Sequence, residues 1–241
     1  LTSVYTVIWT TTPWTIPANL AVAVHPKLEY VFVAVGENHY LILKDLLGQV
    51  AEKCGWRSPQ VVRSFNGSEL EGVKFTHPLV DRESVTVLAD YVTSGDGTGV
   101  VHTAPGHGRD DFYTGQKYGL DVLCPVSDSG VMTDEAGEFA GLYYSKANKA
   151  IVERLGEVKA LLHHEEYQHQ YPHAERDGNP VIFRATEQWF IGMDLPFHGE
   201  PSKSLRQNML EEIQAVEWRP EGSIGRITTM VANRLDWCVS R

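Results

Sequence analysis

The sequence predicts a mainly β fold with α-helices at its periphery. Short runs rich in Val, Ile and Tyr fill its first half, and turn signals separate them about every 8–15 residues. Helical periodicity becomes prominent only after about residue 109. This order favours a closed β structure over βαβ repeats, which would alternate strands with long helices from the start.

The expected strands are short and bounded by Gly, Pro, Asn and Asp. Val-His-Pro and Gly-Glu-Asn turns separate the second, third and fourth of them. They cover residues 4–9, 20–24, 30–35, 40–43, 61–65, 85–88, 100–103 and 122–126.

Four helices are expected, over residues 45–53, 109–118, 145–155 and 202–215. Gly55 and Gly119 would end the first two, and Ser145 would be the N-cap of the third. The fourth has an apolar stripe at helical spacing, made of Leu205, Met209, Leu210 and Ile213.

Composition narrows the class of protein. The 241 residues can bury a sizeable core, and a formal net charge of −10 argues against bulk nucleic-acid binding. The three cysteines, Cys54, Cys124 and Cys238, are widely spaced and odd in number, which suggests reduced thiols in a cytoplasmic protein. No apolar run reaches the length of a membrane span, and no signal peptide is recognised.

The chain begins at Leu1 without an initiator methionine, which suggests a piece of something larger. We expect one domain over residues 1–241, with a core at about 1–160 and an appendage at about 161–241 that returns to a parent body. A monomer is expected.

The most particular stretch is residues 9–19, WTTTPWTIPAN. A β-patterned run leads into three consecutive threonines and stops at Pro13. Side chains alternate faces along a strand, so at least one hydroxyl would point to the buried side. Without a partner it would cost about 1–3 kcal/mol. The ordinary alternative is a threonine-rich strand followed by a proline loop.

This stretch resembles the threonine-rich peptide of the editing (connective peptide) domain in isoleucyl-tRNA synthetases. Residues 97–111, GTGVVHTAPGHGRDD, resemble the other wall of the same pocket. Shorter likenesses occur at residues 171–173, 183–190 and 236–241. The related valyl and leucyl enzymes carry an arginine after the first threonines, where this chain has Thr12, so the isoleucyl member is favoured. The resemblance implies a closed β-barrel core with peripheral helices.

The resemblance also implies catalytic residues. Thr10, Thr11 and Thr12 would hold the terminal adenosine, the ester carbonyl and the attacking water. Asp111 would bind the α-ammonium group of the substrate. From the residues alone, Asp111 and Asp110 are ordinary acids at an exposed helix start, where backbone N–H groups keep a carboxylate ionised.

A substrate-binding set follows from the same resemblance. His102 would act as a steric barrier that admits valine and excludes isoleucine, although a lone strand histidine is more often a wall residue. Packing is the favoured alternative for Trp14, and bracing of the loop is the alternative for Asn19. Gly97 and Gly99 would let the backbone approach a ligand closely. The full set is Trp14, Thr15, Asn19, Gly97, Gly99, His102 and Asp111.

The implied activity is hydrolysis of the aminoacyl ester of valyl-tRNA(Ile), with isoleucyl ester excluded by size. The implied ligands are the tRNA(Ile) 3′ end carrying valine, and valine or valyl-adenylate. No cofactor is expected, and the signatures of adenylate formation are missing, so ATP would bind only elsewhere in a parent enzyme. The alternative is a catalytically silent module that binds the tRNA acceptor end.

A histidine-rich run at residues 163–169, HHEEYQH, is the only metal candidate in the sequence. His164 and His169 are five residues apart, which on a helix turns the rings about 140° from each other. Family members often carry cysteines where this chain has Ala-Glu-Arg-Asp at 174–177. We therefore predict no metal site, and a zinc hydrolase built on this run is the third alternative.

Overall fold

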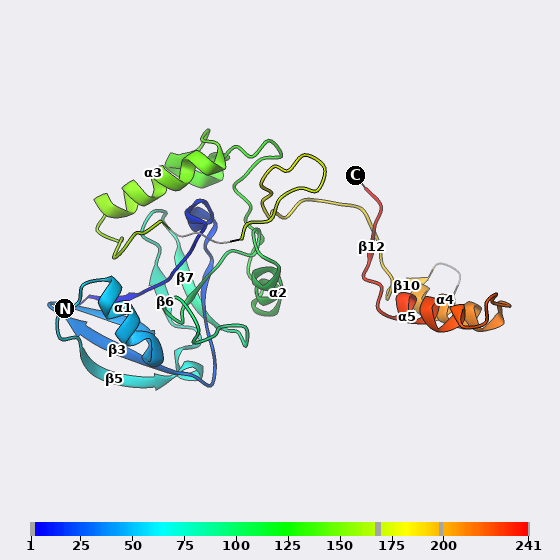
Figure 1. The fold of residues 1–241 in the computed structure, drawn as a ribbon, viewed down its shortest axis with the longest axis horizontal. Helices are drawn as coiled ribbons and strands as arrows, with labels where there is room; N and C mark the ends of the chain where they lie inside the picture. The colour runs from blue at the N-terminus through cyan, green and yellow to red at the C-terminus, as the bar shows by residue number, and fades with distance from the viewer. Residues whose placement is uncertain (1–2, 167–169, 198–199, 241) are drawn as a thin grey trace. The chain divides into compact units, whose positions relative to one another are not determined.

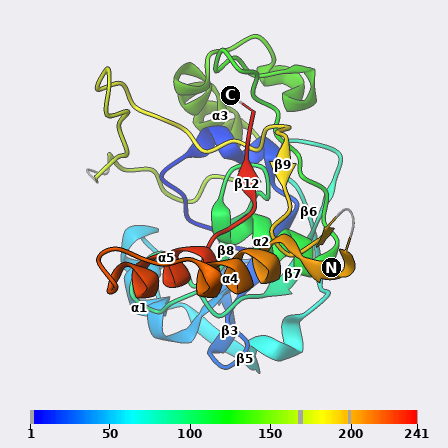
Figure 2. The ribbon, with the colours of Figure 1, turned by 90° about the vertical axis from the view of Figure 1, so that its right-hand side faces the viewer.

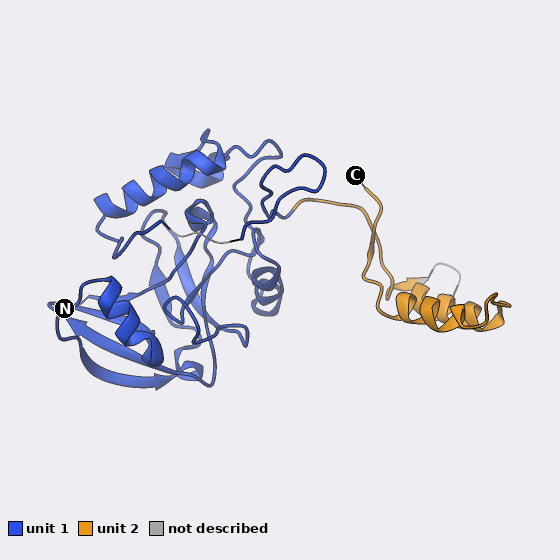
Figure 3. Cartoon of the chain, in the orientation of Figure 1, with its two compact units in different colours: residues 1–185 blue, residues 186–241 orange. Residues whose placement is uncertain are grey.

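The computed structural model describes residues 3–166, 170–197 and 200–240. The chain divides into two compact units, Leu1–Ala185 and Thr186–Arg241, coloured separately in Figure 3. Three residues of the histidine-rich run, Tyr167, Gln168 and His169, lie outside the described residues, as does the last residue of the 236–241 likeness.

Two four-stranded sheets form the centre of the first unit (Figure 1). The first has the order β1-β4-β3-β5, and only its β1–β4 pair is parallel. The second has the order β6-β7-β2-β8, and only its β2–β7 pair is parallel. The strands are β1 (Val4–Thr6), β2 (Ala21–Val24), β3 (Glu29–Val35), β4 (Asn38–Leu43), β5 (Gln60–Asn66), β6 (Lys74–Thr76), β7 (Glu83–Leu88) and β8 (Val101–Thr103).

The two sheets meet where the chain leaves β1. Trp9 forms a parallel bridge with Val101 of β8, so the end of the β1 segment connects one sheet to the other. No pairing of β5 with β6 is found among the described residues. A mixture of sheets and helices is confirmed, and the closed barrel stays a prediction.

Most of the expected strands are present within one or two residues, but two differences have clear physical causes. Residues 122–126 do not form a strand. Pro125 lacks an N–H group there, and the amide of Val126 turns back to the carbonyl of Cys124. The strand β6 was missed because only three residues, Lys74–Thr76, pair at the edge of its sheet.

In the first unit the predicted helix end at Gly119 is confirmed, and the predicted N-cap at Ser145 is not. Residues 44–53 form η2 (Lys44–Leu46) and α1 (Leu47–Lys53). The helix α2 (Arg109–Tyr118) ends at Gly119, whose φ of 66° is left-handed. The helix α3 (Tyr144–Glu157) starts one residue before Ser145. Ser145 as N-cap was therefore wrong, because Tyr144 packs into the core and draws the helix start with it.

The threonine stretch continues into a short 3₁₀ helix, η1 (Pro13–Ala18), that packs against α3. Trp14 and Ile16 of η1 join Ala147 and Ile151 of α3 in one buried cluster. A second buried cluster includes Tyr30 and Leu41 of the first sheet together with Val22 and Val24 of the second. The 3₁₀ turns η3 (Gly67–Leu70) and η4 (Asp134–Phe139) complete this unit.

The second unit contains two strand pairs and two helices (Figure 2). The pairs are β9 (Phe190–Ile191) with β12 (Trp237–Cys238), and β10 (Pro196–Phe197) with β11 (Glu200–Ser204). The helix α4 (Leu205–Ala215) lies beside α5 (Ser223–Ala232), which was not predicted. The N-cap of α4 is Ser204, so the predicted start at residue 202 was too early because residues 202–204 belong to β11. Of its apolar stripe only Ile213 is buried.

Candidate functional site

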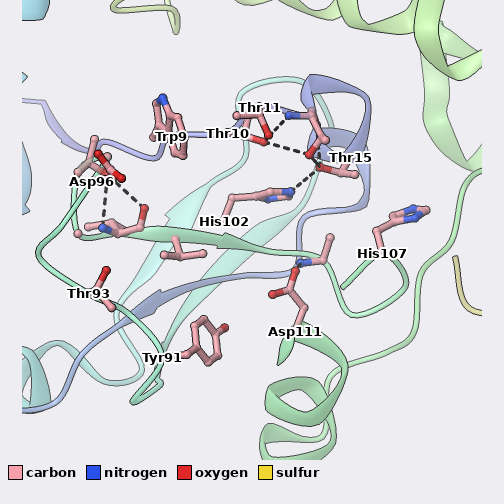
Figure 4. Close-up of a pocket in the computed structure, with 17 residues that line it drawn as sticks. Trp9, Thr10, Thr11, Thr15, Tyr91, Thr93, Asp96, His102, His107 and Asp111 are labelled. Atoms are coloured by element: carbon pink, nitrogen blue, oxygen red, sulfur yellow. Dashed lines mark hydrogen bonds between the residues drawn. The ribbon is translucent and has the colours of Figure 1, made fainter. Parts of the chain in front are cut away.

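The first unit contains a cavity of about 410 Å³ between the threonine stretch, β8 and the start of α2 (Figure 4). Two of the predicted site residues, Trp14 and Asn19, do not line it. The predicted residues that do line it are Thr10, Thr11, Thr12, Thr15, Gly97, Gly99, His102 and Asp111. Sequence reasoning missed further lining residues, among them Trp9, Tyr91, Thr93, Asp96 and His107.

The threonines shape the turn that opens the cavity. The hydroxyl of Thr10 accepts a hydrogen bond from the amide of Thr12 over 3.0 Å, and the amide of Thr15 donates to the carbonyl of Thr12. Pro13, at the first position of η1, supplies the helical φ without needing a partner for an N–H group. The run is therefore a turn stabilised by its own hydroxyls rather than the end of a strand.

The hydroxyls of this stretch differ in how far the protein uses them. Those of Thr10, Thr12 and Thr15 hydrogen-bond within the stretch or to His102. The hydroxyl of Thr11 makes no hydrogen bond to the described part of the chain. Thr11 is therefore the threonine with a hydroxyl group free to bind a ligand.

His102 is held at both ring nitrogens. Its Nε2 lies 3.0 Å from Oγ1 of Thr15, and its Nδ1 lies 2.8 Å from Nδ2 of Asn19. Val100, just before β8, and Val101, its first residue, pack in different hydrophobic clusters, as the predicted alternation of strand side chains requires. The side chain of His102 is 9% exposed and cannot swing out of the cavity wall without breaking both hydrogen bonds.

The environment of His102 keeps the ring neutral. Burial, together with smaller contributions from the charges of His77 and His107, lowers the pKa of His102 to about 3. The Nδ1 lone pair is occupied by an N–H group of Asn19, so this ring has no free basic nitrogen for proton abstraction. A steric role, which needs no change of protonation, fits this arrangement.

Asp111 lies at the third residue of α2, and its Oδ2 accepts a hydrogen bond from the amide of Ala104 over 2.9 Å. The expectation that Asp111 is exposed was wrong: it is half-buried, whereas its neighbour Asp110 is exposed. Burial raises the pKa of Asp111 to about 6, the bond from Ala104 opposes the rise, and Asp110 adds to it. The effect of burial on the Asp111 pKa thus outweighs that of the helix start, and the carboxyl group titrates near pH 6.

Trp14 packs in the core instead of facing the cavity. It is 3% exposed, and its ring meets His107 edge-on at 4.7 Å and Tyr144 at 5.6 Å between centroids. Its backbone amide donates to Oδ1 of Asn148 over 2.9 Å. The geometry agrees with the packing alternative and places no atom of Trp14 on the cavity wall.

Gly97 and Gly99 differ in the space that surrounds them. Gly99 has φ of +73°, and a Cβ there would lie 2.2 Å from Cβ of Leu43. Gly97 has φ of +77°, and a Cβ there would only touch the side chain of Trp9, at 3.4 Å from its Cβ. Close packing against Leu43 of β4 explains why residue 99 is glycine. The predicted close approach of the backbone to a ligand therefore remains as an explanation only for Gly97.

Tyr91 is the missed residue with the clearest chemical signal. Its hydroxyl is buried, lines the cavity and has no hydrogen-bond partner of normal geometry among the described residues. Figure 4 shows it on the same side of the cavity as Asp111. A single tyrosine in a turn-rich segment carries no motif, so nothing in the sequence could have marked it.

Within the ranges that the structure describes, no three His, Cys, Asp or Glu side chains are grouped as a metal ion would require. No described helix is long and apolar enough to cross a membrane. The polar groups that line the cavity are hydroxyls, mainly of threonine, the imidazoles of His102 and His107, and the carboxyl groups of Asp96 and Asp111.

Residues 3–241 match the family of class I tRNA synthetases for isoleucine, leucine, methionine and valine, described as "tRNA synthetases class I (I, L, M and V)". The chain belongs to this family, and the predicted family resemblance is confirmed. Over 235 residues it is 51% identical to isoleucine–tRNA ligase of Bacillus cytotoxicus, which covers 98% of this chain and 24% of that protein. Isoleucine–tRNA ligase 1 of Oceanobacillus iheyensis is 49% identical, over 98% of this chain and 25% of its own. The chain thus spans about a quarter of the length of these relatives.

The fold is similar to that of the crystal structure described as GlLeuRS-CP1, with a TM-score of 0.55. The likeness covers 69% of this chain and 86% of the other, at 16% sequence identity. At that identity the comparison concerns the fold, and the chemistry of the site must be argued from its own residues.

Proposed function

We propose that this chain hydrolyses the aminoacyl ester of valyl-tRNA(Ile) and leaves the isoleucyl ester intact. The observation that carries the proposal is the shared cavity, which is lined by Thr11 of the threonine stretch, His102 of β8 and Asp111 of α2. Its volume of about 410 Å³ falls within the range of about 300–1,000 Å³ typical of small-molecule pockets. That volume suits an amino acid together with part of a ribose.

The carboxylate of Asp111 would bind the α-ammonium group of the esterified amino acid. One of its oxygens is held by Ala104, and the other accepts no hydrogen bond from the described chain. A charge-assisted hydrogen bond of this kind contributes about 1.5–3 kcal/mol. It also selects a free amino group, which a peptidyl ester lacks.

The reaction needs a placed water rather than a protein nucleophile. Water attacks the ester carbonyl carbon, the bond to the ribose oxygen breaks, and that oxygen takes up a proton, so that valine and tRNA leave. The hydroxyl of Thr11 is a suitable donor to the carbonyl, while Thr10 and Thr12 hold the turn and adjoin the ribose. Proximity and fixed donors then supply the rate acceleration. No cofactor enters this scheme.

Selection by size rests on the rigidity of His102. One methylene in an apolar pocket is worth only about 1–3 kcal/mol, a limit for which isoleucine and valine in this enzyme class are the standard illustration rather than a result of this structure. Exclusion by overlap is steeper, because close-packed walls yield little. His102 is pinned at both nitrogens, so it can act as such a wall together with Thr15.

The tRNA 3′ end is the proposed partner, and the chain is proposed to act as a monomer. A formal net charge of −10 disfavours wide contact with phosphates, so the rest of a longer synthetase would provide most of that contact. We also propose that the whole protein charges tRNA(Ile) with isoleucine in the cytoplasm. Residues 1–241 would act as one editing domain that binds valine or valyl-adenylate as small-molecule ligands and does not activate amino acids.

The test is release of valine from valyl-tRNA(Ile), with isoleucyl-tRNA(Ile) and a no-protein control in parallel. We expect release of valine well above the spontaneous rate and none of isoleucine. The alternative of a silent acceptor-end module predicts that tRNA binds without release above that rate. A zinc hydrolase predicts loss of release with a chelator, whereas the proposed mechanism predicts no change.

A further inference from the structure

Ser84, at the start of β7, is buried behind the cavity wall and takes no part in the mechanism above. Its hydroxyl donates a hydrogen bond to the side-chain oxygen of Asn19. The strand β7 pairs with β2, and β2 pairs with β8, where Val22 faces His102. The sheet therefore places Ser84, Asn19 and His102 in a row across three neighbouring segments.

The amide of Asn19 has only one orientation that satisfies its neighbours. The carbonyl of Ala21 can only accept, so the atom that lies 2.8 Å from it must be the nitrogen of the Asn19 amide. The same nitrogen lies 2.8 Å from Nδ1 of His102, and the Asn19 oxygen faces Ser84. The Ser84 hydroxyl donates to the Asn19 oxygen, which would otherwise be a buried acceptor without a partner.

This orientation determines the proton position on His102. Because Asn19 donates to Nδ1, that nitrogen must carry a lone pair, and the ring proton lies on Nε2. The Nε2–H group donates to the hydroxyl of Thr15, which in turn donates to the carbonyl of Thr12 over 2.8 Å. One directed chain of hydrogen bonds thus runs from β7 to the threonine turn.

We propose that Ser84 is a positioning residue that sets, through Asn19, the tautomer and ring orientation of His102, and thereby the discrimination between valyl and isoleucyl esters. Without Ser84 the Asn19 oxygen is buried with no donor, so the side chain gains by rotating until that oxygen meets a donor, which withdraws its N–H group from Nδ1 of His102. The ring is then no longer restricted to the Nε2–H tautomer. In the Nδ1–H tautomer Nε2 is an acceptor, so the Thr15 hydroxyl donates to the ring and releases the Thr12 carbonyl.

The structural arm of the test is ¹⁵N NMR of the histidine rings in the full chain, with the His102 signals identified by their loss in His102→Gln. We expect the neutral Nε2–H pattern in the wild-type protein and a mixture of tautomers in Ser84→Ala. Ser84→Thr keeps the hydroxyl and should restore the wild-type pattern. Unchanged His102 signals in Ser84→Ala would overturn the proposal whatever the enzyme does.

Thr86→Val is the matched control for the loss of a buried hydroxyl. Thr86 lies two residues along β7 on the same face, is 1% exposed, and its hydroxyl has no hydrogen-bond partner among the described residues. We expect Thr86→Val to leave the His102 tautomer and the ester discrimination unchanged. A Thr86→Val protein that behaves like Ser84→Ala would show a general packing effect and contradict a specific role of Ser84.

The functional arm rests on the proposed hydrolysis and measures the ratio of valyl to isoleucyl ester cleavage. In Ser84→Ala we expect this ratio to fall about tenfold, the scale of one buried hydrogen bond, with a smaller change in the valyl rate. A ratio equal to wild type would overturn the role in discrimination. If the wild-type chain cleaves neither ester, the proposed function fails, while the NMR arm still decides whether Ser84 positions His102.

Discussion

The carboxylate of Asp111 accepts a hydrogen bond from the backbone amide of Ala104, with 2.9 Å between Oδ2 and N. Ala104 directly follows β8, and Asp111 is in the first turn of α2, so this bond joins two walls of the cavity. The carboxylate therefore has a structural partner on one oxygen and an unused oxygen for a ligand. Variants of Asp111 must separate these two roles.

Asp111→Asn should remove the charge and keep the bond from Ala104. We expect valyl ester hydrolysis to fall about ten- to a hundredfold, as the loss of a charge-assisted bond predicts, with little change in unfolding free energy. Asp111→Ala should also lose about 1–3 kcal/mol of stability, because it leaves the buried Ala104 amide unpaired. The measurements are deacylation rates and urea unfolding.

Asp110→Asn is the control for this pair of variants. It removes the same charge from the neighbouring residue, which is exposed. We expect wild-type hydrolysis and wild-type stability. A loss of activity in Asp110→Asn equal to that in Asp111→Asn would assign the effect to the net charge of the helix start and not to a specific contact.

Hydrolysis should depend on pH through Asp111. Burial raises its pKa to about 6, so the carboxyl group becomes protonated as the pH falls through that value and can no longer pair with an ammonium group. We expect kcat/KM for valyl-tRNA(Ile) to decline below about pH 6. Because the pKa of Asp111 is higher in the folded than in the unfolded chain, the protonated carboxyl group favours the folded state. This stabilisation is fully present below about pH 4 and is lost as the pH rises through about 6.

A pH profile of kcat/KM for the wild-type protein and for Asp111→Asn checks this assignment. The decline should be absent from the variant, whose amide does not titrate. If both proteins show the same acidic limb, another group is responsible, and Asp111 is not the ionising residue that binds substrate.

His102→Ala should allow the isoleucyl ester to be cleaved. The substitution removes the ring that narrows the cavity and frees the space beside Thr15. We expect the ratio of valyl to isoleucyl cleavage to fall by at least about tenfold, the lower end of what one methylene can be worth. His39→Ala, on β4 outside the cavity lining, is the control and should keep the wild-type ratio. A His102→Ala protein that still spares isoleucyl-tRNA(Ile) would contradict a size barrier at this position.

Tyr91→Phe should not destabilise the protein. The Tyr91 hydroxyl is buried without a hydrogen-bond partner of normal geometry among the described residues, so its removal relieves a desolvation cost. We expect the unfolding free energy to stay equal or rise by up to about 1 kcal/mol. Tyr118→Phe is the matched control, since the Tyr118 hydroxyl bonds Glu71 and the amide of Leu88. It should lose about 1 kcal/mol.

Gly99→Ala should be far more harmful than Gly97→Ala. Both glycines have left-handed φ, a conformation that costs other residues about 1–2 kcal/mol. At Gly99 the new methyl group would also overlap Leu43 in the core, whereas at Gly97 it would meet the Trp9 ring at contact distance. Thermal unfolding of the two variants measures the difference, and equal melting temperatures would contradict the packing role of Gly99.

Local signals explain what could be predicted about the fold. Residues 109–118 form the expected helix, which ends at Gly119 because glycine readily adopts the left-handed conformation found there. Residues 30–35 and 40–43 form strands because their β-branched and aromatic side chains are buried together. Ser145 is not the N-cap, although serine favours that position, because the burial of Tyr144 makes the helix begin one residue earlier. Residues 122–126 do not form the predicted strand because Pro125 lacks an N–H group, and Val126 forms only an isolated bridge with Met132.

The sequence by itself determined the family and the candidates His102 and Asp111, because each depends on residue types in a contiguous run. That the threonines form a turn and not the end of a strand was decided by the structure. Only the tertiary structure decided that Asp111 is half-buried and bound to Ala104, and that Trp14 faces the core. The tertiary structure alone also decided that Asn19 donates a hydrogen bond to His102 and accepts one from Ser84. The physical reason is that these contacts depend on strand register and helix packing between distant segments, whereas a linear sequence specifies only which groups are available to meet.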